Sequence, residues 1–222
     1  MRRSAAFVVM GWALLQGPIP GSAQEIQLFN GRDLSGWESF LTEEGARMED
    51  VWSVQDGILV ATGEPQGYLY TTEDFESYTL VVEWRWPGEP GNSGVLLPGN
   101  SGVLLRVDPE PVMLPSAIEA QLRNGRAGDM YGFQGFPIAG NPHRLSEISI
   151  GWSLPRIQGN ENDPGEWNRY DITVEGDQIT LAINGVVVNE AWNCQVRPGR
   201  IALQSEGAEI HFRTVTLSPL GR

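Results

Sequence analysis

Apolar and polar residues alternate with a period of two along most of the chain. The clearest examples are the segments YTLVVEWRW (78–86), AIEAQLR (117–123) and YDITVEGDQITLAINGVVV (170–188). A period of two is typical of β-strands with one buried face, because successive side chains point to opposite faces of a sheet. No segment shows a long helical period. The pattern therefore predicts a chain built almost entirely of strands.

Short turn signals separate these strands. Asn184-Gly185 and Gly176-Asp177 divide the segment 170–188 into three strands, and Asp56-Gly57 divides VWSVQDGILVAT (51–62) into two. Asn-Gly and Asp-Gly favour the tight turns of β-hairpins. RIALQSEGAEIHFRTVTL (200–217) predicts two further strands about its Glu-Gly-Ala turn, and Phe136–Gly165, rich in Gly, Pro and Asn, is predicted to be a long loop region. Many short strands with regular turns indicate an all-β fold, an antiparallel β-sandwich or jelly roll.

One motif occurs twice in succession. The sequence GNSGVLL spans residues 91–97 and again residues 99–105, with Pro98 between the copies. Two units of eight residues are too short for a repeat architecture, which needs units of about 20 residues or more. Proline cannot donate a hydrogen bond in a central strand, so Pro98 interrupts the first copy. We therefore expect the sheet strand to be formed by the second copy, over Val103–Val107. The first copy is either a loop or the outer arm of a hairpin.

The N-terminus has the pattern of an export signal. Arg2 and Arg3 precede an apolar run over residues 5–15, and small residues precede Gln24. This pattern predicts a signal peptide over residues 1–23 and a single mature domain over residues 24–222. An uncleaved anchor is the alternative, although the apolar run is shorter than the roughly 20 residues that span a bilayer. We expect an exported protein, periplasmic or extracellular, with no membrane attachment after cleavage.

The charge balance excludes some classes of function. The chain has 28 acidic residues against 15 basic ones, a formal net charge of −13, and it contains no lysine. Nucleic-acid binding needs a basic surface, so this function is excluded. Without lysine, Schiff-base catalysis and a phosphate-loop lysine are excluded as well. The single cysteine, Cys194, cannot form an internal disulfide, and we interpret it as a small buried side chain.

Three predicted strands carry polar faces that could form a site. Glu83 and Arg85 belong to the first strand, Arg106 to the second, and Glu119, Gln121 and Arg123 to the third. One interpretation is a solvated outer face with cross-strand ion pairs, as many antiparallel sheets have. The other is a concave cleft for a carbohydrate, because arginine and amide groups bind pairs of hydroxyl groups.

Individual residues elsewhere are weaker candidates. Asp129 could orient a ligand or simply form a turn, and Tyr131 and Phe133 could stack on a sugar ring or belong to the core. His143, in the long loop, could transfer protons near neutral pH or be merely exposed. No metal-binding spacing, serine-hydrolase motif or dinucleotide motif is present.

Five segments together resemble one known family. They are LFNGRDLSGWE, GNSGVLLR, SAIEAQLRNGRAGDMY, GEWNRYDITVEGDQITLAINGVVVNEA and GRIALQSEGAEIHFRTVTLSPL. In this order they resemble the 3-keto-disaccharide hydrolases, also described as 3-keto-glucoside 1,2-lyases and 3-keto-2-hydroxyglucal hydratases. The resemblance implies a concanavalin A-like jelly roll of the lectin and glucanase type. The chain departs from the family in its doubled GNSGVLL.

The resemblance also implies a reaction and a ligand. A base removes the proton on C2 of a 3-keto-glycoside, the enolate expels the group on C1, and water adds to the double bond. Glu119 is the first choice for the base, with His143 as the alternative base or as the acid for the leaving oxygen. The implied substrate-binding residues are Glu83, Arg85, Arg106, Gln121, Asp129, Tyr131, Gln204, Glu206 and Arg213.

No cofactor is firmly predicted, but some relatives in this family use a divalent metal. If this chain does so, Glu119, Glu206 and Asp129 could supply oxygen ligands. A non-catalytic, lectin-like carbohydrate-binding module is the alternative function, and a structural domain with an exposed apolar patch is a third. The catalytic interpretation requires that Arg106, Glu119 and Gln121 lie side by side in one hollow.

Overall fold

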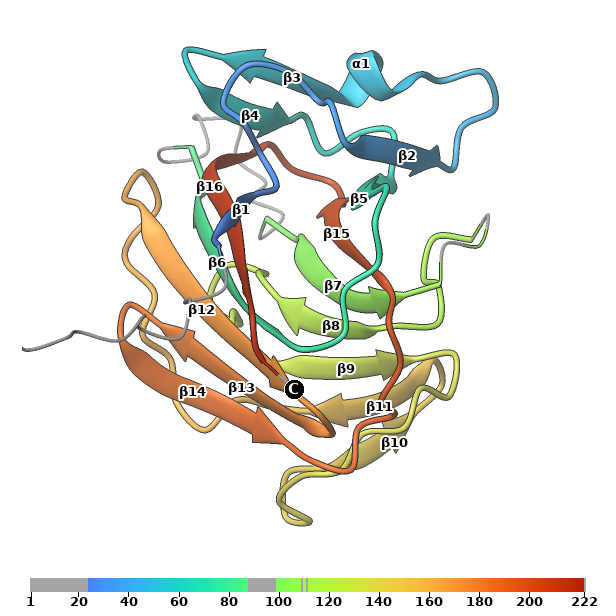
Figure 1. Ribbon diagram of the computed structural model, residues 1–222, viewed down its shortest axis with the longest axis vertical. Helices are drawn as coiled ribbons and strands as arrows, with labels where there is room; N and C mark the ends of the chain where they lie inside the picture. Colours follow the sequence, from blue (N-terminus) through green and yellow to red (C-terminus); the bar gives the residue numbers. More distant parts are fainter. Residues whose placement is uncertain (1–23, 88–98, 109, 111, 222) are drawn as a thin grey trace, which may run out of the picture.

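The computed structural model describes residues 24–87, 99–108, 110 and 112–221, so the predicted signal peptide and the first GNSGVLL copy lie outside the described residues. Two antiparallel sheets pack face to face (Figure 1), which confirms the predicted all-β sandwich. Sheet A has the order β14 (Val186–Ala191), β13 (Gln178–Ile183), β12 (Asn168–Glu175), β6 (Tyr78–Arg85), β16 (Ile210–Pro219), β4 (Ile58–Ala61) and β3 (Trp52–Gln55), with β1 (Ile26–Gln27) beside β16.

Sheet B has the order β10 (Ser146–Ile148), β11 (Gly151–Leu154), β9 (Met130–Phe133), β8 (Ile118–Gln121), β7 (Gly102–Val107), β15 (Arg200–Ser205), β5 (Gly67–Thr71) and β2 (Trp37–Leu41). One short helix, α1 (Met48–Val51), precedes β3. Within the described ranges, no helix has the length and apolar character needed to cross a membrane.

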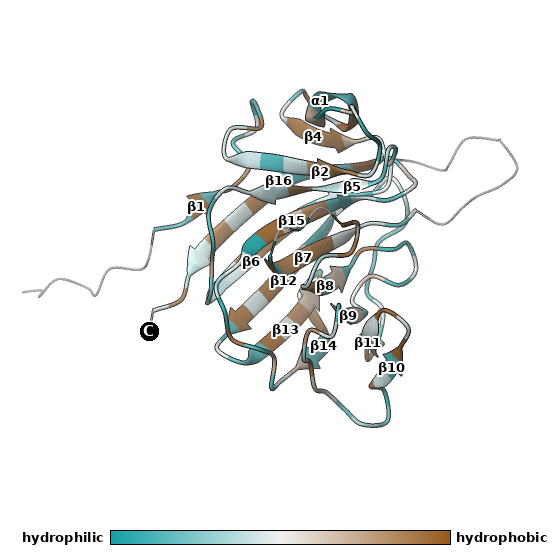
Figure 2. Ribbon diagram, turned by 90° about the vertical axis from the view of Figure 1, so that its right-hand side faces the viewer, coloured by the Kyte–Doolittle hydropathy of each residue, from teal (hydrophilic) through white to brown (hydrophobic). Residues whose placement is uncertain are grey.

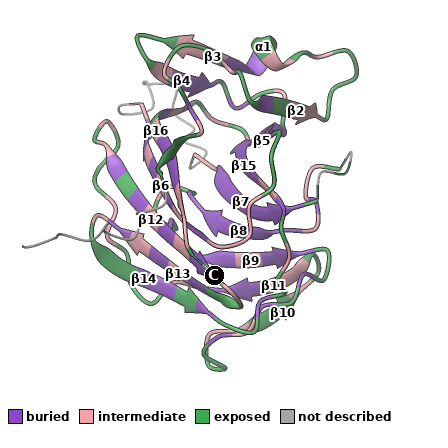
Figure 3. Ribbon diagram, in the orientation of Figure 1, coloured by how far each residue is buried: buried purple, intermediate pink, exposed green. Residues whose placement is uncertain are grey.

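The alternating pattern fills the space between the two sheets. Along β6, Tyr78, Leu80, Val82 and Trp84 are fully buried and the residues between them are not. Figure 2 shows the resulting bands of hydropathy along the strands of sheet A, and Figure 3 shows that the middle strands of both sheets are the buried ones. Burying each large apolar side chain stabilises the fold by about 1.5–3 kcal/mol. Packing of these inner faces therefore holds the two sheets together.

The predicted hairpin turns form as expected. Asn184 and Gly185 have φ angles of 50° and 80°, and Asp56 and Gly57 have φ angles of 51° and 79°. Two successive positive φ values define the turn whose twist matches that of antiparallel strands. The β13–β14 and β3–β4 hairpins are therefore determined locally by their turn residues.

The structure confirms the two strands predicted about Glu206-Gly207-Ala208 and corrects one prediction about a connection. The two confirmed strands lie in different sheets, β15 in sheet B and β16 in sheet A. This connection crosses between the sheets and leaves Glu206 at the end of a sheet-B strand. The predicted loop region 136–165 also contains strands β10 and β11, which pair with each other at the edge of sheet B. Edge strands this short have too few residues for a recognisable alternation.

The second GNSGVLL copy forms a strand, as predicted, but a bulge redirects Arg106. Across the β7–β15 pair, Val107 lies opposite Arg200 and Leu104 lies opposite Ala202, so β7 has one extra residue. Arg106 has a φ of 55°, which is rare outside glycine. A bulge of this kind reverses the side to which the following residues point. Strict alternation places Arg106 on the same face as Leu104, and this prediction is wrong.

Instead, the guanidinium of Arg106 is fully buried between the two sheets. It donates one hydrogen bond to the carbonyl of Gln195 at 2.6 Å and another to the carbonyl of Gly176, at the β12–β13 turn. Burial lowers the pKa of Arg106. Arg106 therefore connects loops of the sandwich and does not lie beside Glu119 and Gln121, so the expected grouping of all three in one hollow is wrong. A catalytic site must combine Glu119 and Gln121 with residues other than Arg106.

We predict that Arg106→Met reduces stability and leaves the carbohydrate site intact. The substitution keeps much of the side-chain volume but removes two hydrogen bonds from a buried guanidinium to part-buried carbonyl groups, which costs about 2–4 kcal/mol. Urea denaturation measures the change in the free energy of unfolding, and ligand binding is measured on the folded fraction. A variant with unchanged stability and lost binding would show that Arg106 belongs to the site after all.

Candidate functional site

A pocket opens on the outer face of sheet B, away from the space between the sheets. It has a volume of about 200 Å³. Its lining residues are Asn100, Leu114, Glu119, Gln121, Tyr131, Phe133, Ile150, Gln204 and Glu206. We call it the sheet-B pocket. It is smaller than the pockets of about 300–1,000 Å³ that hold drug-sized ligands, so it suits one small polar ring.

The second GNSGVLL copy builds the floor of this pocket. A Cβ atom at position 102 would collide with Oε1 of Glu119 and would lie 2.5 Å from Oε1 of Gln204. Only glycine leaves room for both side chains above β7. Beside it, the hydroxyl of Ser101 donates to the main-chain carbonyl of Gln204 at 2.9 Å. The motif therefore packs β7 closely under the polar side chains of β8 and β15.

Glu119 is a buried carboxyl group without a basic partner. Glu119 is only 2% exposed, even though it lines a pocket that is open to solvent. Burial raises the pKa of Glu119 well above its usual range, and the nearby carboxylates of Glu206 and Asp129 raise it further. Among the residues that the structure describes, no arginine or histidine forms an ion pair with Glu119. Burial and the neighbouring carboxylates therefore favour the protonated form of Glu119.

Glu206 is the second carboxyl group of the pocket and is less deeply buried. Burial raises the pKa of Glu206, while a hydrogen bond from Asn100 and the charge of Arg123 lower it. The two carboxyl groups thus have different environments in one pocket. Such a difference separates an acid from a base in many active sites.

Two glutamine side chains line the pocket, and they differ in the hydrogen bonds that they make within the protein. Oε1 of Gln121 accepts hydrogen bonds from the backbone N–H groups of Leu122 at 2.9 Å and Arg123 at 2.8 Å, so its NH₂ group faces the pocket. Gln204 is fully buried, and within the described ranges neither its Oε1 nor its Nε2 has a hydrogen-bond partner. A buried polar group without a partner needs a ligand or water to satisfy it. The pocket therefore offers amide donors to a polar ligand.

An apolar wall faces these polar groups. The rings of Tyr131 and Phe133 stack with centroids 6.0 Å apart and an angle of 13° between their planes. Leu114 and Ile150 extend this wall. A polar floor with an aromatic wall suits a sugar ring, whose C–H faces pack on aromatic rings while its hydroxyl groups bind amides and carboxylates.

The structure brings together six of the candidate residues and not the others. The six that line the sheet-B pocket are Glu119, Gln121, Tyr131, Phe133, Gln204 and Glu206. Asp129 does not: Oδ2 accepts from Nε of Arg126 at 2.7 Å, and Oδ1 accepts from the backbone N–H of Arg156 at 2.8 Å. Asp129 is fully buried and braces two loops.

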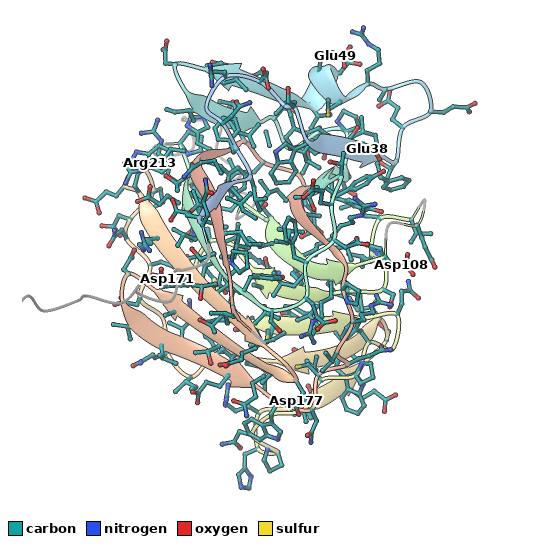
Figure 4. The ribbon with its side chains drawn as sticks, viewed as in Figure 1. Glu38, Glu49, Asp108, Asp171, Asp177 and Arg213 are labelled. Carbon is teal, nitrogen blue, oxygen red and sulfur yellow. The ribbon has the colours of Figure 1, made fainter. Side chains whose placement is uncertain are left out.

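Three predicted substrate-binding residues lie on the other sheet. Glu83 accepts two hydrogen bonds from Arg213, each at 3.0 Å, and Arg85 donates to Nδ1 of His211 at 3.2 Å. Arg85 and Arg213 both lie 4.6 Å from the ring of Trp167. Figure 4 shows Arg213 on the side of sheet A that faces away from sheet B. The prediction that they line the pocket is wrong, because β6 and β16 both belong to sheet A, whose outer face is solvated and carries ion pairs.

His143 also lies away from the pocket. Its side chain is exposed, and its loop is attached to β14 of sheet A. Arg144 donates to Oδ1 of Asn189 in β14 at 2.9 Å, and Ala139 pairs with Trp192 just after β14. A loop of this length can cross to either sheet, and its sequence does not show which.

The predicted oxygen ligands for a metal do not assemble. Glu119 and Glu206 share the pocket, but both oxygens of Asp129 are occupied by Arg126 and Arg156. In the described part of the chain, no group of three or more histidine, cysteine, aspartate or glutamate side chains is arranged to hold an ion. The residues therefore do not fit the suggested ligand set.

Three lining residues escaped the sequence analysis. Leu114 and Ile150 are apolar loop residues with no distinguishing pattern, and they reach the pocket only through the fold. Asn100 could have been found, because it belongs to the GNSG segment that is present in both copies. Its hydrogen bond to Glu206 gives that segment a role beyond strand formation.

Comparisons with known proteins agree on a carbohydrate-related fold. Residues 24–218 match the 3-keto-alpha-glucoside-1,2-lyase-like domain. Among solved structures, a candidate glycosyl hydrolase from Parabacteroides distasonis is 19% identical with a TM-score of 0.62, covering 89% of this chain and 94% of that one. The carbohydrate-binding module CBM66 from Bacillus subtilis is 12% identical, with a TM-score of 0.57 and coverage of 82% and 95%. The β-glucanase of Bacillus licheniformis is 10% identical, with a TM-score of 0.55 and coverage of 91% and 100%.

No curated protein sequence matches the chain. At these low identities the solved structures show the fold alone, which is the jelly roll of glucanases and lectins. The fold and the matched domain together support a carbohydrate-active function.

We predict that Gly102→Ala disturbs the pocket more than its small change in volume suggests. The added methyl group must displace Glu119 and Gln204, and overpacking of this kind costs about 1–3 kcal/mol. Urea denaturation measures the loss in the free energy of unfolding. Gly221→Ala is the matched control, because a Cβ atom there meets no atom within 4 Å. Equal stability of the two variants would contradict the close packing of Glu119 on β7.

The raised pKa of Glu119 predicts a particular pH dependence of stability. The folded protein holds this proton more tightly than the unfolded chain, so the resulting stabilisation is present at low pH. It is lost as pH rises from about 4.3, the unfolded value, through the raised folded pKa. Glu119→Gln removes this titration, so the wild type should lose stability relative to the variant as pH increases.

Thermal denaturation of both proteins between pH 4 and pH 9 measures this difference. Glu44→Gln, which replaces an exposed glutamate, is the control. A constant difference in stability between Glu119→Gln and the wild type over this range would show that Glu119 is not held in its protonated form.

Proposed function

Because the chain belongs to the family of 3-keto-alpha-glucoside-1,2-lyase-like domains, we propose that it cleaves 3-keto-glycosides by elimination followed by hydration. The observation that carries this proposal is the pair of carboxyl groups, Glu119 and Glu206, in one pocket of about 200 Å³ with unequal burial. Elimination next to a ketone needs a base for the C2 proton and an acid for the leaving oxygen. The pocket can supply one of each.

Glu206 is the proposed base. It is less buried than Glu119, and Asn100 and Arg123 both favour its ionised form. In the first step its carboxylate takes the proton from C2 of the sugar, and the electron pair moves toward the C3 ketone to form an enolate. The ordinary pKa of a C2 hydrogen is far too high for a carboxylate, but the adjacent ketone lowers it. The base therefore needs correct placement more than unusual strength.

The amide groups of Gln121 and Gln204 are the proposed donors to the enolate oxygen. The NH₂ group of Gln121 is directed by two backbone hydrogen bonds to its own carbonyl oxygen. The Gln204 amide has no partner among the described residues, so it can bind a ligand without first breaking a bond. Donors that are already oriented stabilise developing charge without reorganisation, which is commonly the largest contribution to catalysis.

Glu119 is the proposed acid. The enolate expels the group on C1, the C1–O bond breaks, and Glu119 gives its proton to the leaving oxygen. Water then adds its hydroxyl group to C1 and a proton returns to C2, so that 3-keto-glucose and the free alcohol are the products. This assignment reverses the expectation from the sequence, in which Glu119 was the base. The reason is burial, which favours the proton on Glu119.

A lectin-like binding module is the competing function, and the similar module from Bacillus subtilis shows that this fold type also serves binding. A binding site needs the aromatic wall and the amide groups but has no use for a carboxyl group with a strongly raised pKa. We therefore favour the enzyme. On the N-terminal pattern of Arg2, Arg3 and the apolar run, we also propose that it acts outside the cytoplasm.

We predict opposite kinetic signatures for the two carboxyl groups. In deuterated water the wild type should release the alcohol from a 3-keto-glucoside and incorporate deuterium at C2, as mass spectrometry and NMR measure. Glu206→Gln should slow both by about 10²–10⁴-fold, the usual contribution of a general base. Glu119→Gln should slow the release of a methanol leaving group strongly and of 4-nitrophenol much less, because 4-nitrophenolate leaves without a proton.

The pH profile and controls complete this test. Wild-type activity should fall at low pH as Glu206 gains its proton, and at high pH as Glu119 loses its own. Glu44→Gln should behave as the wild type. Alcohol release without deuterium at C2 would overturn the elimination, and sugar binding without any turnover would favour the binding module.

A further inference from the structure

A second hollow adjoins the sheet-B pocket. It has a volume of about 410 Å³ and is lined by Arg123, Asn124, Arg126 and Tyr131. We call it the arginine hollow. Tyr131 lines both cavities, so a ligand that fills the sheet-B pocket can extend past this ring into the arginine hollow. Its lining is basic, whereas the chain as a whole carries a formal charge of −13.

The two arginines of the hollow differ in their partners. Arg126 forms an ion pair with the buried carboxylate of Asp129 at 2.5 Å, which compensates its charge. Arg123 is exposed, and no described residue forms an ion pair or a side-chain hydrogen bond with its guanidinium. Its charge still acts on Glu206, whose pKa it lowers. Arg123 is therefore an uncompensated cation at the border between the hollow and the pocket.

The loop that carries both arginines is held firmly in place. The carboxylate of Glu161 accepts from the backbone N–H groups of Gly125 and Ala127, each at 3.1 Å. Arg156 pairs with Glu161 at 2.6 Å and donates to the carbonyls of Ala127 at 2.8 Å and Gly125 at 2.7 Å. A loop clamped through four backbone groups needs little ordering when a ligand binds, which favours affinity.

We propose that the arginine hollow is the subsite for the leaving group and that it selects leaving groups that carry a carboxylate. Guanidinium and carboxylate form paired, charge-assisted hydrogen bonds, and Arg123 has its donors free for them. The ring of Tyr131 forms the wall that the leaving group passes. The inference rests on the proposed function only in identifying this part of the ligand as the leaving group of the glycoside.

Two matched ligands test the subsite directly. They are 4-carboxyphenyl glucoside and 4-carbamoylphenyl glucoside, which differ in charge but hardly in shape and, lacking the 3-keto group, cannot undergo the elimination. Calorimetry measures the dissociation constants for the wild type and for Arg123→Gln, with Arg32→Gln as a control for the loss of an exposed arginine elsewhere. Both anomers are tested.

We expect the wild type and Arg32→Gln to bind the carboxylate about three- to fivefold more tightly than the amide, the range of an exposed ion pair. Arg123→Gln should bind both ligands equally. The preference should also shrink in 1 M salt, where the screening length is about 3 Å. Equal affinities in the wild type, or a preference that survives Arg123→Gln, would overturn the subsite.

The same ligands in their 3-keto form separate this inference from the proposed reaction. A carboxylate preference that depends on Arg123, without deuterium exchange at C2, would support the subsite and overturn the elimination. Exchange and release with equal rates for both ligands in the wild type would support the elimination and overturn the subsite.

Discussion

The burial of the Glu119 carboxyl group against Gly102 is the contact on which the candidate site depends. An outer sheet face normally meets water, and a carboxylate on it keeps an ordinary pKa. Strand β7 has a glycine at position 102, so the Glu119 side chain packs directly against the backbone of this strand. Glu119 is 2% exposed and has no basic partner among the described residues. The same space admits the amide of Gln204. A single missing methyl group thus creates both the raised pKa and the close grouping of polar side chains.

The two outer faces of the sandwich show how similar patterns produce different surfaces. On sheet A, Glu83 accepts hydrogen bonds from Arg213, and this pairing lowers the pKa of Glu83. On sheet B, Glu119 is buried and has carboxyl neighbours instead of an arginine, and burial first and these neighbours second raise its pKa. Alternation along each strand is the same in both cases. The neighbouring strands decide whether a glutamate meets an arginine or another carboxyl group.

The long connections support the site without entering its chemistry. Asp129, Arg156 and Glu161 form a buried and half-buried network that fixes the loop between β8 and β9. This loop carries Arg123 and, together with Tyr131 of β9, lines the arginine hollow. Asp129, which the sequence suggested as a ligand-binding residue, therefore holds this loop in place instead of contacting a ligand. The same holds for Arg106, whose hydrogen bonds to carbonyls connect loops between the sheets.

The sequence by itself determined the strands, the hairpin turns and the all-β class, because alternation and Asn-Gly or Asp-Gly turns act over a few residues. It also pointed to Glu119, Gln121, Tyr131 and Phe133, and the family resemblance added Gln204 and Glu206; the fold gathers all six in one pocket. Only the tertiary structure decided that Arg106 faces inward, since one bulged residue reverses a period of two. It likewise decided that Glu83, Arg85 and Arg213 lie on the other sheet, because strand pairing between distant segments leaves no local mark in a sequence.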